Sequence, residues 1–416
     1  MAKDVDEPAE PTRRDYLTYG GTIVGGGLIA GCSGDSGSDG GDGSTDAGAT
    51  DAGTPTPTPE PNTPTATPTE TATPESESYS VTMAPAGAVE FDSVPETWMA
   101  YYSTYGDMGL ALGQLDGLQA LVYRDSWTTQ FYDALPGVDV SLDGVQQLFK
   151  SGFGKEALYE IDADAYLVDS EFASLKHDSI TTEDFDEVAG NVGPVIGNYI
   201  RRSGGDWREY PTYSLYEAFE KIAEVFQERE RYEAIEAVHD EFVADLEEDL
   251  PPAGERPQIG LVSAYSDFPN GSLDAYPIGD GNGKKQYQDL GVGDGFGEYI
   301  DGSYASWDYE QLLEADPEIL VFPYAYELSA SEFEERIDGL RSHPVGERLT
   351  AVENGRLYRG GTSYQGPILN LLQTEVAAKQ FYPEQFGEWN GLETLQDEDA
   401  QLFDHQRVAD VINGEF

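Results

Sequence analysis

One pattern occurs twice in the sequence, as Glu156-Ala-Leu-Tyr-Glu-Ile-Asp-Ala-Asp-Ala-Tyr-Leu167 and as Glu310-Gln-Leu-Leu-Glu-Ala-Asp-Pro-Glu-Ile-Leu-Val321. In each copy a Glu begins a short helix, a Leu two residues later packs inward, an Asp ends the helix, and a buried strand follows. The copies lie on opposite sides of a long helical segment, so they predict two similar α/β halves. Helix–turn–strand units also look alike by composition alone, and that explanation stays open at this point.

Short β-like runs alternate with helical patterns from Val81 onward, which is typical of parallel sheets with crossover helices. Between two groups of these runs, residues 215–250 carry apolar side chains at helical spacing and end at two consecutive prolines, which predicts one or two long helices. The order is therefore an α/β half, a helical connection and a second α/β half. The clearest predicted strands are 119–123, 165–168, 194–199, 258–262 and 318–322.

The N-terminal residues have the features of an export signal followed by a tether. Arg13 and Arg14 precede a weakly apolar stretch, 19–30, in a pattern typical of twin-arginine (Tat) signals for folded proteins. The stretch leads to Ile29-Ala-Gly-Cys32, which resembles a lipoprotein attachment motif, and Cys32 is the single cysteine of the chain. We expect a lipid on Cys32; a buried small side chain or a catalytic thiol is the alternative.

The sequence also indicates how the exported protein is held together and how the chain is divided. With a single cysteine, an intramolecular disulfide is excluded, so core packing alone must hold the exported protein together. We therefore expect a globular region anchored to the outer face of the cell membrane through a Gly/Ser/Asp and Thr/Pro linker. The segments are a twin-arginine lipoprotein signal at 1–31, a disordered tether at 32–78, an N-terminal α/β lobe at 79–214, a connecting long-helix region at 215–252, and a C-terminal α/β lobe at 253–416.

The chain is strongly acidic, with 79 Asp and Glu against 23 Lys and Arg and a formal net charge of −56. Nucleic acids and anionic membrane surfaces are poor partners for it, because phosphate binding depends on Lys and Arg. The acidic residues spread along most of the chain, which is typical of halophilic, archaeal proteins whose self-repulsion is screened by salt. An acidic surface that binds cations is the alternative.

The second copy of the pattern, extended to 307–321, resembles a segment of the substrate-binding proteins of iron-siderophore and cobalamin ABC importers, in which a Glu-led helix runs into an Ala-Asp-Pro turn and a strand. Ala351-Val-Glu-Asn-Gly-Arg-Leu-Tyr358 is similar to a hairpin of that family. Residues 366–375, with Phe381-Tyr-Pro383, are similar to its closing helix and chain end. The resemblance covers about residues 85–388 and is looser in the first half.

The resemblance implies an α/β fold with two Rossmann-like lobes joined by a single long helix and a ligand cleft between the lobes. It also implies a monomeric binding protein without a cofactor or catalytic residues, whose partners are an ABC permease and its ATPase. In the family each lobe presents a surface glutamate to the permease. The family motif implies that Glu310 has this docking role in the second lobe, and the internal repeat then points to Glu156 in the first. The helix dipole alone also favours Glu near a helix start.

Ligand-binding residues are expected beyond the carboxyl ends of the strands, where open α/β sheets bind their ligands. Loops at these positions are rich in Tyr, Trp and Arg, which suits a bulky, planar or chelated ligand with electronegative groups. Ordinary core or surface positions are the alternative for each residue. The predicted ligand-binding residues are Tyr105, Arg124, Trp127, Arg201, Arg202, Tyr265, Tyr324 and Tyr364.

Other functions have less support in the sequence. The four histidines are scattered, so a transition-metal site has no visible basis, although a tyrosine-rich site for bare ferric iron stays open. The Gly-rich run 279–285 lacks the spacing of a phosphate-binding loop, and we expect it at the edge of the cleft. We predict a solute-binding lipoprotein that captures an iron(III)-siderophore or cobalamin-like ligand and delivers it to the permease. An extracytoplasmic enzyme and a ligand-sensing receptor subunit are the alternatives.

Overall fold

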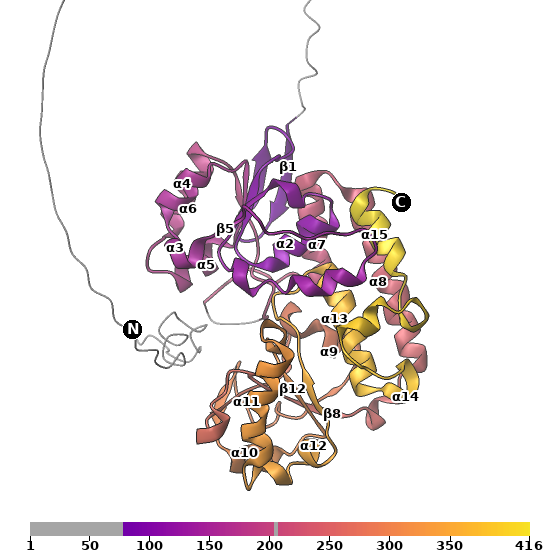
Figure 1. Ribbon diagram of the computed structural model, residues 1–416. Helices are drawn as coiled ribbons and strands as arrows, with labels where there is room; N and C mark the ends of the chain where they lie inside the picture. Colours follow the sequence, from indigo (N-terminus) through magenta and orange to yellow (C-terminus); the bar gives the residue numbers. More distant parts are fainter. Residues whose placement is uncertain (1–77, 204–206) are drawn as a thin grey trace, which may run out of the picture. The chain divides into compact units, whose positions relative to one another are not determined.

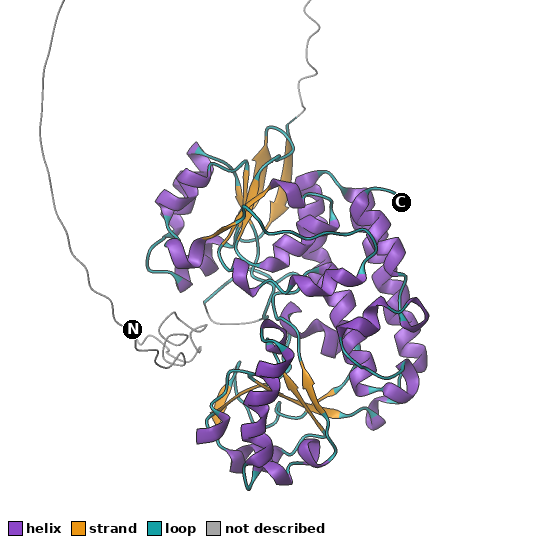
Figure 2. Ribbon diagram, viewed as in Figure 1, coloured by secondary structure: helices purple, strands orange, loops and turns teal. Residues whose placement is uncertain are grey.

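The computed structural model describes residues 78–203 and 207–416. The predicted export signal, Cys32 and the tether up to residue 77 lie outside the described residues. Within the described ranges, a pair of sheets forms the centres of a pair of α/β lobes, with helices packed around each sheet (Figure 2). This is the fold class expected from the alternation of strands and helices.

The first lobe is built on a five-stranded parallel sheet of order β5-β4-β3-β6-β7 and carries a separate antiparallel hairpin, β1-β2. Because all five strands are parallel, their carboxyl ends meet at one edge of the sheet. The strands are β1 Tyr79–Met83, β2 Gly87–Phe91, β3 Trp98–Ala100, β4 Leu118–Leu121, β5 Gln146–Gln147, β6 Ala165–Leu167 and β7 Val195–Ile196. The helices are α2 Ser103–Ala111, α3 Leu148–Ser151, α4 Lys155–Ile161, α5 Ser170–Lys176 and α6 Thr182–Asn191, with short 3₁₀ turns at η2 Arg124–Ser126 and η3 Thr129–Ala134.

The second lobe is built on a six-stranded mixed sheet of order β11-β9-β8-β12-β13, with β10 also paired to β8. β8, β10, β12 and β13 run parallel, whereas β9 and β11 form its antiparallel edge. The strands are β8 Gln258–Val262, β9 Leu273–Tyr276, β10 Gly293–Asp294, β11 Ala305–Trp307, β12 Ile319–Phe322 and β13 Leu357–Arg359. The helices are α9 Lys285–Asp289, α10 Tyr309–Ala315, α11 Ala330–Ser342 and α12 Thr350–Glu353, with 3₁₀ turns at η6 Asn282–Lys284 and η7 Ala325–Glu327.

The sequence repeat is confirmed as a structural repeat. α4 leads into β6 in the first lobe, and α10 leads into β12 in the second. Each helix ends at an aspartate in the left-handed conformation, Asp162 with φ 51° and Asp316 with φ 36°. Each strand then pairs with the first strand of its sheet, β6 with β3 and β12 with β8.

The connection between the lobes consists of α7 Leu215–Phe226 and the longer α8 Arg229–Asp249, within the one or two long helices that the apolar spacing predicts. The break falls at Gln227, whose φ of 56° ends α7 in the left-handed conformation. The two helices then pack on each other, with the rings of Phe219 and Tyr232 5.3 Å apart. The predicted strand 194–199 is also shorter than expected, because only Val195–Ile196 pair with β6.

The lobes join around α13 Pro367–Phe381, all 15 residues of which are buried (Figure 1). One continuous apolar core extends from Trp98 of the first sheet through Phe219 and Leu371 to Ile319 of the second sheet. Because α13 is buried on every side, it has no solvent-facing polar stripe and shows little amphipathic pattern, and its polar residues, Glu375 and Lys379 among them, are buried as well. α14 Pro383–Phe386 and α15 His405–Asn413 complete the chain beside it.

A fully buried ionic cluster lies on α13. The carboxylate of Glu375 is 2.7 Å from His405 Nε2 and 3.8 Å from Lys379 Nζ, and it accepts a hydrogen bond from the Leu402 amide. The second ring nitrogen of His405 faces the Ala134 carbonyl of the first lobe at 3.2 Å. The cluster therefore ties α13, the C-terminal segment and η3 together.

Candidate functional site

Tyrosines that follow strands of both sheets meet where the lobes join. We call this group the aromatic cluster, and it comprises Tyr102, Tyr123, Tyr199, Tyr324 and Tyr364. Tyr102 and Tyr364 stack at 4.5 Å between ring centroids with their planes 18° apart. Tyr102 also stacks on Tyr123 at 5.2 Å, and Tyr324 lies 6.0 Å from Tyr364. The first three residues belong to the first lobe and the last two to the second, so the cluster bridges the lobes at the strand ends expected for a ligand site.

Arg201 places a positive charge within the aromatic cluster. It follows β7 of the first lobe, and its side chain donates a 2.7 Å hydrogen bond from Nη2 to the Tyr324 hydroxyl of the second lobe. Its guanidinium carbon lies 4.6 Å from the ring centroid of Tyr364. Only 8% of Arg201 is exposed. A guanidinium held against aromatic faces in this way can bind a carboxylate, a phenolate or another aromatic face.

Three further basic residues, Arg202, Arg208 and Lys284, lie close to Arg201. Arg208 donates to the carbonyls of Tyr199 and Arg202, and its guanidinium lies 5.0 Å from the Trp207 ring. Lys284, from the second lobe, donates to the Pro277 carbonyl, and burial together with the nearby Arg202 lowers its pKa well below the usual range. In a chain with a net charge of −56, this concentration of cations distinguishes the junction from most of the surface.

The Gly-rich run 279–285 brings Lys284 to this place. The amides of Asn282 and Gly283 donate to the carbonyls of Ile200 and Arg201, so the run pairs with the backbone of the other lobe. Gly281 has φ 98°, and a Cβ there would come within 2.6 Å of Arg202 Cα. The run is therefore a close backbone contact between the lobes, which requires glycine at this point.

A second contact between the lobes is made by Asp107 of α2. Its carboxylate accepts hydrogen bonds from the Ile368 and Leu369 amides at 2.9 and 3.1 Å, and from the Tyr132 hydroxyl at 2.6 Å. Asp107 thus caps the first turn of α13 from the opposite lobe. Because Asp107 is fully buried, its pKa rises from the ordinary 3.8 to about 7. We call α13, Asp107 and the Glu375–His405–Lys379 cluster the helical seam.

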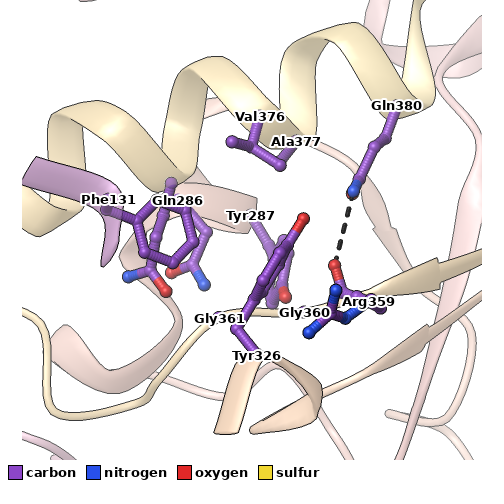
Figure 3. Close-up of a pocket in the computed structure, with 11 residues that line it drawn as sticks. Phe131, Gln286, Tyr287, Tyr326, Arg359, Gly360, Gly361, Val376, Ala377 and Gln380 are labelled. Carbon is purple, nitrogen blue, oxygen red and sulfur yellow. Dashed lines mark hydrogen bonds between the residues drawn. The ribbon is translucent and has the colours of Figure 1, made fainter. Parts of the chain in front are cut away.

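A small pocket lies against α13 (Figure 3). It is lined by Phe131, Tyr326 and the backbone of Gly360 and Gly361, with Gln380 closing one side through a 3.3 Å hydrogen bond to the Arg359 carbonyl. It leaves about 10 Å³ for the centre of a water-sized molecule, which is room for about one water. Ligand sites are typically of the order of 300 Å³ or more, so this space does not hold a chelate.

A family model described as periplasmic binding protein matches residues 156–364, which is half of the chain. The chain belongs to the periplasmic binding protein family. The match begins at Glu156 and ends at Tyr364, so it contains both copies of the repeat and several residues of the junction, among them Arg201, Tyr324 and Tyr364. Membership of this family implies an extracytoplasmic solute-binding protein.

Solved structures show the same fold. A periplasmic solute binding protein from Veillonella parvula superposes with a TM-score of 0.54 at 12% identity, over 78% of this chain and 92% of the other. An ABC-type Fe3+-hydroxamate transport protein from Saccharomonospora viridis gives 0.50 at 18% identity, over 73% and 99%. Helicobacter pylori Ceue with Ni(II) bound gives 0.51 at 10% identity, over 74% and 90%. No curated protein sequence matches the chain.

The predicted ligand-binding residues of this periplasmic binding protein fall into three groups. Arg201, Tyr324 and Tyr364 come together in the aromatic cluster, and the Arg202 backbone lies beside them. The structure places Tyr105 and Trp127 inside the first core instead, where Tyr105 pairs with the Asn198 backbone and Trp127 donates to Tyr132.

Two other predicted residues engage neighbours outside the cluster. Arg124 is partly exposed and pairs with Asp125 at 2.9 Å. Tyr265 donates to Glu327 at 3.0 Å and lies under the Arg336 guanidinium.

Several residues of the junction are not among the ligand-binding residues predicted from the sequence. Tyr123 and Tyr199 stand at the ends of predicted strands, so the strand-end rule was available to find them. Trp207, Arg208 and Lys284 carry no comparable signal, because their positions depend on backbone contacts between distant segments.

The two residues predicted to dock on the permease lie on the surface. Glu156 and Glu310 are exposed in the first turns of α4 and α10, at equivalent positions of the repeat.

Metal sites and membrane spans are two further features that bear on function. The described residues hold no group of three or more His, Cys, Asp or Glu side chains placed to bind a metal ion. The helices within 78–203 and 207–416 also include none with the length and apolarity needed to cross a bilayer.

Proposed function

We propose that the protein is the extracytoplasmic solute-binding component of an ABC importer that captures an iron(III)-siderophore or cobalamin-like ligand between its lobes. Family membership and the likeness to an Fe3+-hydroxamate transport protein support this. The observation that carries the proposal is Arg201, which reaches across the junction to Tyr324 and Tyr364 at the strand ends of the other lobe. Aromatic faces and a guanidinium suit a large chelate with electronegative oxygens.

Capture requires only binding and a change in the lobe arrangement. The ligand stabilises whichever arrangement it binds more tightly, by the difference between its two affinities. The helical seam keeps the lobes attached through buried contacts, so we expect rearrangement at the aromatic cluster with little movement at α13. No covalent step is involved in this proposal.

The test is a fluorescence titration with ferric hydroxamates, ferric catecholates, cobalamin and haem. Trp207 is a suitable reporter because its ring is 6.0 Å from Tyr199 of the aromatic cluster. We expect micromolar or tighter saturable quenching by one of these classes, with smaller quenching in Trp207→Phe at unchanged affinity. Absence of binding by every ligand, checked by calorimetry, would count against the proposal.

Delivery to a permease is proposed through Glu156 and Glu310, which are exposed at equivalent positions of the two lobes. Matched controls exist one turn further along the same helices at Glu160 and Glu314, which are also exposed. Charge reversal of the first pair is expected to abolish ligand uptake by cells while leaving ligand affinity unchanged. Reversal of the control pair is expected to preserve uptake, and equal loss from both pairs would point to surface charge in general.

We also propose that a lipid on Cys32 anchors the protein outside the cell and that its acidic surface is adapted to high salt. Mass spectrometry of the membrane fraction is expected to show a lipidated Cys32 at the start of the mature chain. The melting temperature is expected to rise between dilute buffer and molar KCl, because salt screens the repulsion within a chain of charge −56. A soluble, unmodified Cys32 protein or a salt-independent melting temperature would contradict these two points.

A further inference from the structure

The ring of Tyr364 occupies a position bounded by groups that favour a flat aromatic ring. Tyr102 stacks on it at 4.5 Å, and the Arg201 guanidinium lies 4.6 Å from its centroid. Tyr123 and Tyr324 add rings at 6.5 and 6.0 Å. Stacking and cation–π attraction both require a π face at this position, and an alkyl group would provide neither.

The backbone of Tyr364 is fixed independently of its ring. Its amide donates to Thr362 Oγ1 at 3.1 Å, and its carbonyl accepts from the Ser103 hydroxyl at 3.0 Å. Rotation of the side chain about the Cα–Cβ bond leaves both hydrogen bonds intact. The ring can therefore leave its position without separating the segment that carries it from the first lobe.

We propose that Tyr364 is an internal plug whose position is taken by an aryl ring of the bound ligand. An iron-chelating ligand with catechol-type rings would then stack on Tyr102 and face the Arg201 guanidinium, as the phenol ring of Tyr364 does in this structure. Its phenolate oxygens would also pair with the guanidinium charge. The inference rests on the proposed function and selects the aryl class of chelators over the alkyl hydroxamates.

The test compares two simple probes, the ferric complexes of 2,3-dihydroxybenzoate and of acetohydroxamate, on three variants. Tyr364→Ala removes the plug, Tyr364→Phe keeps its ring, and Tyr358→Ala is the control, a half-buried tyrosine of β13 that contacts Phe381. Tyr364→Leu removes the ring but keeps a larger apolar side chain than alanine, and it serves if the alanine variant does not fold. Affinities are measured by calorimetry in molar KCl.

The wild type is expected to prefer the dihydroxybenzoate complex. Removing the plug is expected to strengthen its binding about tenfold, because one ring stack and one cation–π contact no longer compete with the ligand. Tyr364→Phe keeps the competing ring and is expected to lack the tenfold gain. Tyr358→Ala is expected to match the wild type, and binding of acetohydroxamate is expected to change less than twofold in all variants.

Several results would overturn the inference. Weaker binding of the dihydroxybenzoate complex to Tyr364→Ala would make Tyr364 an ordinary ligand contact. A wild type that binds the acetohydroxamate complex and not the aryl complex would refute the inference while leaving the proposed function standing. If the wild type binds neither these probes nor any other chelate, the proposed function fails and the inference fails with it.

Discussion

The helical seam and the aromatic cluster both join the two lobes, but they are built from different contacts. The helical seam is fully buried and contains directional hydrogen bonds, in which the first-turn amides of α13 donate to Asp107 and the Glu375 carboxylate pairs with His405. The aromatic cluster consists mainly of stacked rings with the Arg201 guanidinium against them. Buried polar pairs cost much when broken, whereas one aromatic face can replace another. We infer that the seam holds the lobes and the cluster exchanges partners.

The largest expected effect is a loss of stability on breaking the ionic cluster of the seam. Glu375→Ala leaves the buried Lys379 and His405 without their carboxylate, and we expect unfolding free energy to fall by about 3–5 kcal/mol. Glu384→Ala on the exposed face of α14 is the control, with an expected change within about 0.5 kcal/mol. Unfolding by guanidinium chloride in molar KCl measures the stability of both variants. If Glu375→Ala loses as little stability as Glu384→Ala, the ionic cluster does not hold the seam together.

Loss of the Asp107 cap is expected to cost somewhat less. Asp107→Ala removes the acceptor of two α13 amides and of the Tyr132 hydroxyl, and we expect a loss of about 2–3 kcal/mol. Ligand affinity is expected to fall as well, because the lobes lose a fixed contact. A variant with wild-type stability would show that the carboxylate does not hold α13.

Asp107 also predicts a pH dependence of definite sign. Its folded pKa of about 7 exceeds the ordinary 3.8, so the folded state keeps a proton that the unfolded state has lost between these values. Its contribution to the free energy of unfolding is therefore full below pH 4 and decreases as pH rises to about 7. The difference in stability between wild type and Asp107→Asn, followed from pH 4 to 8, is expected to show this slope; a slope of the opposite sign would contradict a raised pKa.

The aromatic cluster is expected to respond in affinity more than in stability. Arg201→Ala removes the hydrogen bond to Tyr324 and the contact with Tyr364, and we expect ligand affinity to fall about tenfold with a stability loss of about 1 kcal/mol. Arg124→Ala is the matched arginine control, since Arg124 pairs with Asp125 outside the cluster. If Arg201→Ala and Arg124→Ala change the affinity for the best-binding chelate equally, Arg201 has no special role in binding the ligand.

The smallest effect is expected at Tyr265. Its hydroxyl donates to Glu327 away from the aromatic cluster, so Tyr265→Phe is expected to change affinity less than twofold and stability by less than about 1 kcal/mol. Calorimetric titration with the same chelate provides the measurement. A tenfold loss of affinity would extend the ligand site toward Glu327.

The architecture could be predicted because apolar periodicity and turn residues report it locally. The two copies of the repeat have the same helix, the same left-handed aspartate and equivalent strands, as their sequences indicated. The division of the helical connection at Gln227 was not predictable, because glutamine carries no signal for a positive φ. That break depends on how α7 and α8 pack together, which no single stretch of sequence encodes.

The candidate site could be predicted only incompletely. Strand ends pointed to Arg201, Tyr324 and Tyr364, because parallel strands place their carboxyl ends at one edge. The same rule selected Tyr105 and Trp127, whose side chains turn into the core, since a sequence does not report the direction of a loop side chain. Lys284 reaches the junction through backbone pairing between residues about 80 positions apart, which lies beyond local patterns.

A crystal structure of the protein with the chelate that titrates most tightly tests the division between seam and cluster most directly. We predict the chelate against Tyr102, Arg201 and Tyr324, at the strand ends of both lobes, with the hydrogen bonds from the Ile368 and Leu369 amides to Asp107 unchanged. A chelate bound elsewhere on the protein, or bound at the cluster with the contact between Asp107 and α13 broken, would contradict the division between a holding seam and an exchanging cluster.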